Sequence, residues 1–367
     1  MIPLTLPAVA EAERAFITRL RLSGADSIGP TDSILLDDEA HGATFAGACG
    51  LVAIDGVTGR ALDGDVVLVQ PQDGRADGAA RVERLLRAGS LHNTLLVTER
   101  CDQLCVMCSQ PPKKTHVDRF DLFEEACLLA EPDSVIGISG GEPTLYKDRL
   151  CCMIERVLEA RQDLEFHVLT NGQHFRHDDI ERLRNPVYRR VSWGIPLHAA
   201  EPALHDGIVA KEGAFARLEE SFASLLLAGA RVELRTVLLS SNVAALPALA
   251  RHVTVRLRWI ESWSIMQLEN IGFAKNRWSQ LYVDHAADFE PIAAALDCAA
   301  LWGVPARLFN FPRCTVPAAY RVQAAASISD WKRKYVPACT GCRAREDCCG
   351  FFEWHPEAQA MAGATPL

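Results

Sequence analysis

From residue 94 onward, short apolar segments with strand character alternate with longer segments that carry apolar residues at helical spacing. The predicted strands are Thr94–Thr98, Ser134–Ser139, Glu165–Thr170, Arg189–Ile195, Arg231–Leu239 and Trp259–Gln267. The predicted helices are Arg119–Ala130, Tyr146–Arg161, Ala214–Gly229 and Phe289–Leu301. Strands joined by crossover helices pair in parallel and coil right-handed into an open or closed barrel. The pattern therefore predicts an α/β fold with six parallel strands, whose reactive groups lie on loops at the carboxyl ends of the strands.

The first ninety residues or so have a different pattern. Short β-type runs such as Ser33–Leu36 and Asp65–Gln70 alternate with turn clusters rich in Gly and Asp, which predicts a small β-rich module. Its boundary is expected near Gly89 and Ser90. A length of 367 residues favours two or three domains. We expect three: the β-rich module over 1–90, the barrel over 91–303 and a cysteine-rich region over 304–367.

Composition excludes several classes of protein. The net charge of −9 has the wrong sign for a surface that follows nucleic-acid phosphates. No apolar run reaches the ~18 residues that a membrane span needs, so we expect no membrane partner. The segment Met1–Arg14 has no basic leader, so we expect a cytoplasmic protein. In that compartment 13 cysteines indicate metal or cluster binding rather than a disulfide framework.

Three cysteines, Cys101, Cys105 and Cys108, lie directly after the first predicted barrel strand. Three thiolates at this spacing hold three irons of a [4Fe-4S] cluster and leave the fourth iron open for a substrate or cofactor. A structural zinc site is the alternative, but it needs a fourth ligand.

A second group of cysteines follows the barrel. Its members are Cys314, Cys339, Cys342 and Cys348, with Cys349 as the alternative to Cys348. Four thiolates suit either a second [4Fe-4S] cluster or a tetrahedral zinc site, and the spacing does not separate the two. The remaining cysteines are interpreted as small buried apolar residues: Cys49, Cys127, Cys151, Cys152 and Cys298.

Two motifs together resemble the radical S-adenosylmethionine (SAM) superfamily. The first is CxxxCxxC after the first barrel strand, and the second is Ser139-Gly-Gly-Glu-Pro-Thr144 after the second. The resemblance implies a partial (β/α)6 barrel and S-adenosylmethionine bound to the open iron. It also implies that Gly140, Gly141 and Glu142 meet the amino group of the methionine moiety. Two glycines allow close backbone approach to a ligand, and a carboxylate accepts hydrogen bonds from an ammonium group.

The same resemblance suggests further contacts with the cofactor. Polar groups at the strand ends are expected to contact its ribose and carboxylate, namely Asn171 where the third predicted strand ends, Ser192 on the fourth and Arg235 on the fifth. Met107 replaces the aromatic residue that usually precedes the third cysteine, and its thioether is expected to pack against the adenine. Gly272, after the sixth strand, is expected near the adenosine. No catalytic side chain is assigned by the sequence.

The cysteines after the barrel resemble the Twitch and SPASM auxiliary-cluster regions of radical SAM enzymes that act on peptides. Cys105-Val-Met-Cys-Ser-Gln-Pro-Pro-Lys113, together with the Cys-x5-Cys-Cys-Gly-Phe-Phe sequence that ends at Phe352, is similar to the radical maturase of the His-Xaa-Ser system lettered C. This resemblance implies a precursor peptide with His-Xaa-Ser repeats as substrate and a second radical SAM maturase as partner. It also implies an electron donor such as flavodoxin or ferredoxin.

Two other functions remain open at this stage. The first is a radical SAM enzyme for a small molecule or nucleotide, with a basic pocket made by Lys332, Arg333, Lys334, Arg343 and Arg345. The second is a metal-binding adaptor of a maturase complex with no catalysis of its own, which docks through residues 1–90.

Three lone polar residues are not assigned to a site. His198 and His205 follow the fourth predicted strand and Glu269 follows the sixth, and all three are expected to be solvated.

Overall fold

The computed structural model describes residues 4–22, 28–39, 41–71 and 80–367, so the start of the segment Met1–Arg14 lies outside the described residues. The chain divides into two compact units. Unit 1 is formed by Met1–Val97, Val117–Ser139 and Tyr146–His167, and unit 2 by Thr98–His116, Gly140–Leu145 and Val168–Leu367. Each unit is described by itself.

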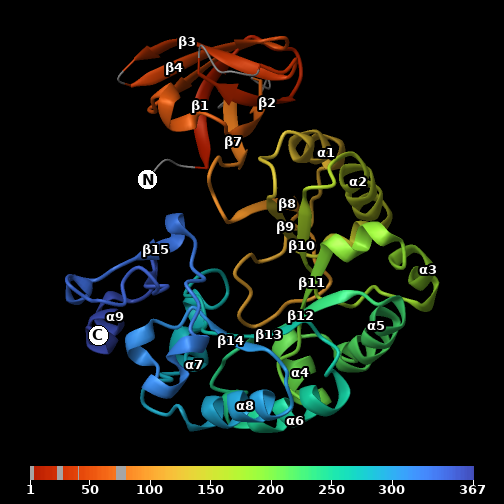
Figure 1. Ribbon diagram of the computed structural model, residues 1–367, viewed down its shortest axis with the longest axis vertical. Helices are drawn as coiled ribbons and strands as arrows, with labels where there is room; N and C mark the ends of the chain where they lie inside the picture. Colours follow the sequence, from red (N-terminus) through yellow and green to blue (C-terminus); the bar gives the residue numbers. More distant parts are fainter. Residues whose placement is uncertain (1–3, 23–27, 40, 72–79) are drawn as a thin grey trace. The chain divides into compact units, whose positions relative to one another are not determined.

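Unit 1 begins with a closed barrel of order β1-β5-β4-β3-β2-β6-β7 (Figure 1). Its strands are β1 (Thr5–Ala10), β2 (Phe16–Arg21), β3 (Asp32–Glu39), β4 (Gly42–Gly47), β5 (Gly50–Asp55), β6 (Val66–Gln70) and β7 (Ala80–Leu86). β2 and β3 pair in parallel, and the other neighbours pair antiparallel. Closure leaves the sheet with no free edge.

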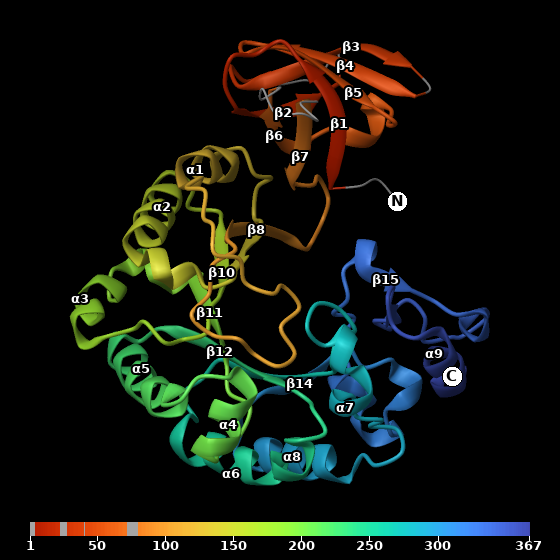
Figure 2. The ribbon, with the colours of Figure 1, turned by 180° about the vertical axis from the view of Figure 1, so that it is seen from behind.

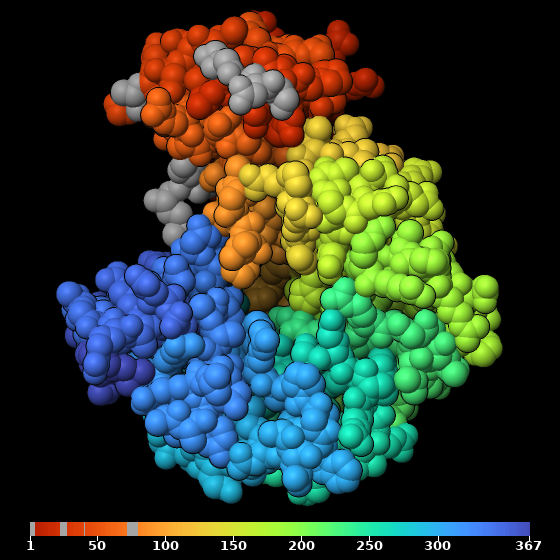
Figure 3. Space-filling view, viewed as in Figure 1, coloured from red at the N-terminus to blue at the C-terminus, as the bar shows by residue number. Residues whose placement is uncertain are grey.

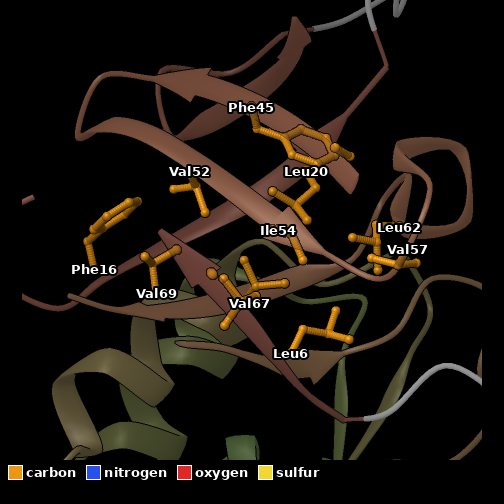
Figure 4. Close-up of a cluster of buried hydrophobic side chains, with 13 residues drawn as sticks. Leu6, Phe16, Leu20, Phe45, Val52, Ile54, Val57, Leu62, Val67 and Val69 are labelled. Atoms are coloured by element: carbon orange, nitrogen blue, oxygen red, sulfur yellow. The ribbon is translucent and has the colours of Figure 1, made fainter. Parts of the chain in front are cut away.

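The interior of this barrel is filled with apolar side chains. Those of Leu20, Phe45, Val52 and Ile54 are almost fully buried and point toward one another inside the barrel (Figure 4). They alternate with outward residues along their strands, the period-2 pattern of a sheet with one buried face. The β-rich module predicted from the sequence is confirmed.

The second sheet has seven strands in the order β14-β13-β12-β11-β10-β9-β8. Its strands are β8 (Asn93–Thr98), β9 (Val135–Gly140), β10 (Glu165–Leu169), β11 (Val191–Pro196), β12 (Arg231–Val237), β13 (Ser262–Met266) and β14 (Ala306–Phe309). The helices are α1 (Phe120–Leu128), α2 (Lys147–Ala160), α3 (Ile180–Leu183), α4 (Pro202–Val209), α5 (Ala214–Ala228), α6 (Leu246–Arg256), α7 (Trp278–Leu281), α8 (Glu290–Leu301) and α9 (Glu357–Gly363). Strands β11 to β14 pair in parallel, which confirms the predicted α/β fold with a parallel sheet.

The sheet has one strand more than the sequence predicted. β14 has only four residues and pairs in parallel with β13, and so short a run leaves no periodic signal. The predicted stop of α5 at Gly229 is confirmed, because Gly229 caps this helix in the left-handed region with φ +71°.

In unit 2, helices α5, α6 and α8 lie on one side of strands β11 to β14 (Figures 1 and 2). Trp193 and Trp263 are fully buried, and the indole of Trp263 donates a hydrogen bond to Thr236 Oγ1 at 2.9 Å. The short strands β15 (Arg333–Lys334) and β16 (Phe351–Phe352) pair antiparallel in the region drawn blue in Figure 3. Among the described residues, none of the helices combines the length and apolar character needed to cross a membrane.

Candidate functional site

The loop with the first three cysteines follows the carboxyl end of β8. Its backbone N–H groups at Leu104 and Val106 donate to the carbonyls of Val209 and Ile208, at 3.3 and 2.9 Å. These carbonyls belong to the last turn of α4, where a helix leaves its C=O groups without partners. The end of α4 therefore fixes the middle of the cysteine loop.

Cys101, Cys105 and Cys108 are half-buried and form no disulfide. The pKa of Cys101 is raised to about 11 and that of Cys105 to about 12, mainly by burial and to a smaller extent by neighbouring thiols. All three thiols belong to one short loop, Cys101 to Cys108. Binding of a metal centre must therefore displace their protons.

Two glycines allow neighbouring loops to lie directly against the cysteine loop. A Cβ atom on Gly141 would lie 2.2 Å from the carbonyl oxygen of Arg100, and one on Gly272 would lie 2.3 Å from that of Cys108. The backbone N–H of Glu142 donates to the Arg100 carbonyl at 2.7 Å, and that of Phe273 to the Cys108 carbonyl at 2.9 Å. The absence of side chains at both glycines therefore serves backbone contact with the cysteine loop itself.

Glu142 lies at the carboxyl end of β9 and is fully buried. Its carboxylate accepts hydrogen bonds from the backbone N–H and the hydroxyl of Thr144, from the hydroxyl of Thr170 and from the backbone N–H of Asn171. Burial raises the pKa of Glu142, and these hydrogen bonds oppose the shift. The carboxylate thus joins the turn after β9 to the turn after β10.

Asp102, between the first two cysteines, connects the cysteine loop to two other loops. Its carboxylate accepts from the Asn171 side chain at 2.7 Å and from Lys211 Nζ, and it lies 3.3 Å from Nε2 of His174. The hydrogen bonds from His174, Lys211 and Asn171 outweigh the effect of burial and hold the pKa of Asp102 well below its usual range. Sequence reasoning missed Asp102, Lys211 and His174, because no motif signals a contact across 109 residues.

Two other residues expected to contact the cofactor have partners within the protein. Met107 packs with the apolar cluster of Ile208 and Leu268. Arg235 forms an ion pair with Glu233, at 3.0 and 3.1 Å.

Ser192 is the second residue of β11 and pairs in register with Arg231, the first residue of β12. It therefore lies at the amino edge of the sheet, opposite to the edge with the cysteine loop. The expectation that Ser192 stands at a carboxyl strand end is wrong. The spacing of apolar residues located the strand, but it did not show at which end of the strand Ser192 lies.

Four cysteines of the second group line one cavity. Cys314, Cys339, Cys342 and Cys348 surround it together with Tyr335 and residues 364–367. The guanidinium groups of Arg333 and Arg345 lie over the ring of Tyr335, 5.3 and 4.8 Å from its centre. Its hydroxyl reaches the carbonyls of Arg345 and Cys348 at 3.0 and 3.1 Å.

Cys348 and Cys349 have different surroundings. A hydrogen bond from Cys349, together with the backbone N–H groups of Gly350 and Arg313 at 3.4 and 3.3 Å, lowers the pKa of Cys348 to about 6. Cys349 is fully buried in an apolar cluster with Ile328 and Phe352, and burial raises its pKa well above the usual value. Of the two, Cys348 has the thiol prepared to ionise.

The remaining cysteines were predicted to be buried, and for two of them this is wrong. Cys127 and Cys151 are buried and Cys298 is half-buried, but Cys49 and Cys152 are exposed. Free cysteines are usually buried, but that tendency does not determine the position of an individual side chain.

Two lone histidines also differ from expectation. His198 and His205 are 4% and 1% exposed, and their rings stack at 5.8 Å. Burial lowers the pKa of His198 to about 3 and that of His205 to about 4. Both are therefore neutral core side chains rather than solvated ones.

Glu269 is half-buried and forms an ion pair with Lys332 at 3.5 Å, so it is not simply solvated either. Lys332 also lies over the rings of Trp331 and Trp354, at 4.9 and 5.8 Å. Lys334 donates to the carbonyls of Glu353 and His355. These basic side chains thus have intramolecular partners.

Both cysteine groups match the chemistry of an iron–sulfur cluster. Within the described part of the chain, no three or more His, Cys, Asp or Glu side chains are arranged to hold a single metal ion. A cubane cluster presents a different iron to each thiolate, so its ligands need not converge on one point. Three free thiols on one loop and four around one cavity fit such clusters.

Comparisons with known proteins identify the domain that carries the first group. Residues 95–251 match the family model described as Radical SAM superfamily. No curated protein matches the sequence.

Several solved structures are similar to this chain. Streptococcus suis SuiB bound to S-adenosylmethionine is 14% identical over 61% of this chain and 51% of its own, with a TM-score of 0.48. SuiB bound to the precursor peptide SuiA has the same identity over 61% and 49%, with a TM-score of 0.47. A radical SAM methyltransferase from Sphaerobacter thermophilus is 15% identical over 81% of both chains, with a TM-score of 0.45. The chain spans about half the length of the SuiB chains. The segment that matches the Radical SAM superfamily model, residues 95–251, includes the cysteine loop and the turns of Glu142 and Asn171.

Proposed function

We propose that this chain is a radical SAM enzyme that modifies a ribosomally made peptide of the His-Xaa-Ser repeat type. In this proposal Cys101, Cys105 and Cys108 bind a [4Fe-4S] cluster with one open iron. When bound, the cluster and S-adenosylmethionine supply a 5′-deoxyadenosyl radical that removes a hydrogen atom from a C–H bond of the peptide.

The observation that carries the proposal is the support of the cysteine loop by two neighbouring turns. Glu142 and Asn171 follow β9 and β10, and Asn171 hydrogen-bonds both Glu142 and Asp102 of the cysteine loop. Buried hydrogen bonds of this kind hold a site in one geometry, which cofactor chemistry requires.

The residues of this chain have three tasks in such a reaction. The cysteines give up their protons and bind the irons. Gly140 and Gly141 let a ligand and the cysteine loop approach the turn after β9 closely. Glu142 and Asp102 orient these turns through hydrogen bonds within the protein, so their carboxylates act as positioning groups.

A second cluster bound by Cys314, Cys339, Cys342 and Cys348 belongs to the proposal. It is supported by the common cavity of these four thiols and by the two backbone N–H groups that donate to Cys348. Such a cluster would bind the peptide or accept an electron after bond formation. The support for a peptide substrate is the resemblance of both cysteine patterns to peptide maturases.

The proposal is tested by anaerobic reconstitution of the full chain. About eight irons and eight sulfides per chain are expected for two cubanes, with zinc measured on the same sample. With reductant and S-adenosylmethionine, the protein should form 5′-deoxyadenosine, and a chain with Cys101→Ala, Cys105→Ala and Cys108→Ala should not. An intact chain that forms none under these conditions would overturn the proposed chemistry.

The substrate is tested separately with a synthetic peptide that contains His-Xaa-Ser repeats. A change in peptide mass, and transfer of deuterium from a labelled peptide into 5′-deoxyadenosine, are expected. A peptide of the same composition with scrambled order is the control. Equal results for both peptides would argue against this substrate while leaving the radical chemistry standing.

A further inference from the structure

The segment 364–367 lies against the four-cysteine cavity and has no role in the reaction described above. It follows α9, whose Ala360 is fully buried with Val336 and Phe351. Trp278 of α7 also donates to Gln359 of α9 at 2.9 Å. The segment therefore starts from an anchored helix.

All four residues of this segment line the cavity together with the four cysteines. Ala364 and Leu367 are half-buried, whereas Thr365 and Pro366 are exposed. The segment thus presents one side to the thiols and the other side to solvent.

Backbone hydrogen bonds hold the segment to two of the cysteines. The N–H of Leu367 donates to Cys342 Sγ at 3.4 Å, and the carbonyl of Leu367 accepts from the N–H of Arg343 at 3.0 Å. The backbone of Thr365 forms a hydrogen bond with the thiol of Cys314. Leu367 therefore forms one hydrogen bond with Cys342 and a second with Arg343, the next residue.

These contacts suit a metal centre better than free thiols. A thiol is a weak hydrogen-bond acceptor, whereas a cluster-bound thiolate carries negative charge and is stabilised by N–H donors. Hydrogen bonds to the sulfurs and exposure to solvent both set the reduction potential of an iron–sulfur cluster. A segment that donates to two sulfurs and covers the cavity affects both properties.

We propose that residues 364–367 form a closing strap over the second iron–sulfur cluster, which donates hydrogen bonds to the Cys314 and Cys342 thiolates and shields the cluster from water and oxygen. The inference rests on the proposed second cluster. Cys348 takes its donors from Arg313 and Gly350 instead, so the strap and the local loops serve different ligands.

The test isolates the second cluster in a full chain with Cys101→Ala, Cys105→Ala and Cys108→Ala. In this background, residues 364–367 are deleted, and separately Leu367→Pro removes one N–H donor. Leu367→Ala keeps that donor and is the matched control. Three properties are measured: iron release to a chelator, bleaching of the cluster absorbance in air, and the midpoint potential followed by electron paramagnetic resonance.

Deletion should speed iron release about tenfold. This is the lower end of the loss in metal affinity that follows when a residue hydrogen-bonded to a metal ligand is removed. It should also speed bleaching and shift the midpoint potential, because it changes both the hydrogen bonds to the sulfurs and the exposure of the cluster. Leu367→Pro should lower the potential, and Leu367→Ala should leave it unchanged. Wild-type rates and potential in the deleted chain would overturn the strap.

The two proposals fail in different ways. The chain that lacks the first three cysteines could hold zinc in place of iron at the four-cysteine site. That result would refute the proposed second cluster, and with it the predicted effect of the strap on a reduction potential. Release of that zinc at the wild-type rate after deletion would show that the segment covers nothing. Iron in the wild-type site with no effect of any strap variant would overturn the strap alone.

Discussion

Replacement of Glu142 by alanine tests whether its buried carboxylate organises the site. The carboxylate is the shared acceptor for the turns after β9 and β10, and it has no contact with solvent. Alanine removes the acceptor and leaves the turns in place. Glu142→Gln is the matched control, because it keeps the size of the side chain and one acceptor oxygen.

The expected cost follows from the donors that lose their partner. The backbone N–H groups of Thr144 and Asn171 become buried and unsatisfied, at about 1–3 kcal/mol each. The hydroxyls of Thr144 and Thr170 are 3.4 Å apart and can pair with each other, so they add little. The free energy of unfolding of unit 2 should therefore fall by about 2–6 kcal/mol for Glu142→Ala, and by about half as much for Glu142→Gln, because one N–H keeps an acceptor.

The assay is thermal unfolding of anaerobically purified protein at a fixed scan rate, with iron content matched between variants. In a unit of this size each kcal/mol lowers the unfolding midpoint by about 2–4 °C. Glu142→Ala should thus lower it by at least about 4 °C, with Glu142→Gln between it and wild type. If Glu142→Ala unfolds at the wild-type temperature yet no longer binds S-adenosylmethionine, Glu142 is a ligand of the cofactor and the positioning role is refuted.

Three further predictions concern the same unit. Gly141→Ala should prevent assembly of the first cluster, because its Cβ would lie 2.2 Å from a backbone carbonyl oxygen. Gly207→Ala is the control and should leave the iron content unchanged, because its Cβ would have nothing within 4 Å. Equal iron content in the two variants would contradict this prediction. Asp102→Asn should speed iron loss from the first site about tenfold, and Lys211→Met should do the same if their ion pair holds the loop. The free energy of unfolding should fall by only about 1 kcal/mol, because both side chains of the pair, 28% and 25% exposed, keep part of their contact with solvent. Burial holds the pKa of His198 at about 3. Below pH 6.5 the unfolded chain therefore takes up a proton that the folded chain does not, and the free energy of unfolding decreases as the pH is lowered. The loss is about 2 kcal/mol by pH 5; His198→Leu should therefore lose less between pH 7 and pH 5 in thermal unfolding, and an unchanged pH dependence would show that His198 does not titrate in this way.

Local periodicity was enough to find most of the sheet. The predicted strand Glu165–Thr170 differs from β10 by one residue, and the predicted helix Ala214–Gly229 differs from α5 only in its capping residue. Apolar spacing over several residues is a strong signal for such elements. The four residues of β14 are too few to give it, so this strand needed the pairing with β13 to be seen.

The partners of polar side chains could not be read from the sequence. Arg235 forms an ion pair with Glu233, two residues away on the same strand, which the sequence did not indicate. Lys211 was not singled out at all, although it contacts the cysteine loop. A polar side chain pairs with whatever the fold brings near it, and spacing along the chain does not record that.

The sequence by itself determined the two sets of cysteines and the order of strands and helices that carries them, because ligand spacing and apolar periodicity are properties of neighbouring residues. Tertiary structure decided which residues support those cysteines. Glu142 became a buried acceptor shared by two turns, and residues 364–367 came to line one cavity with four thiols that begin 50 residues earlier, at Cys314. Such contacts join segments far apart in the chain, and packing of the whole unit creates them.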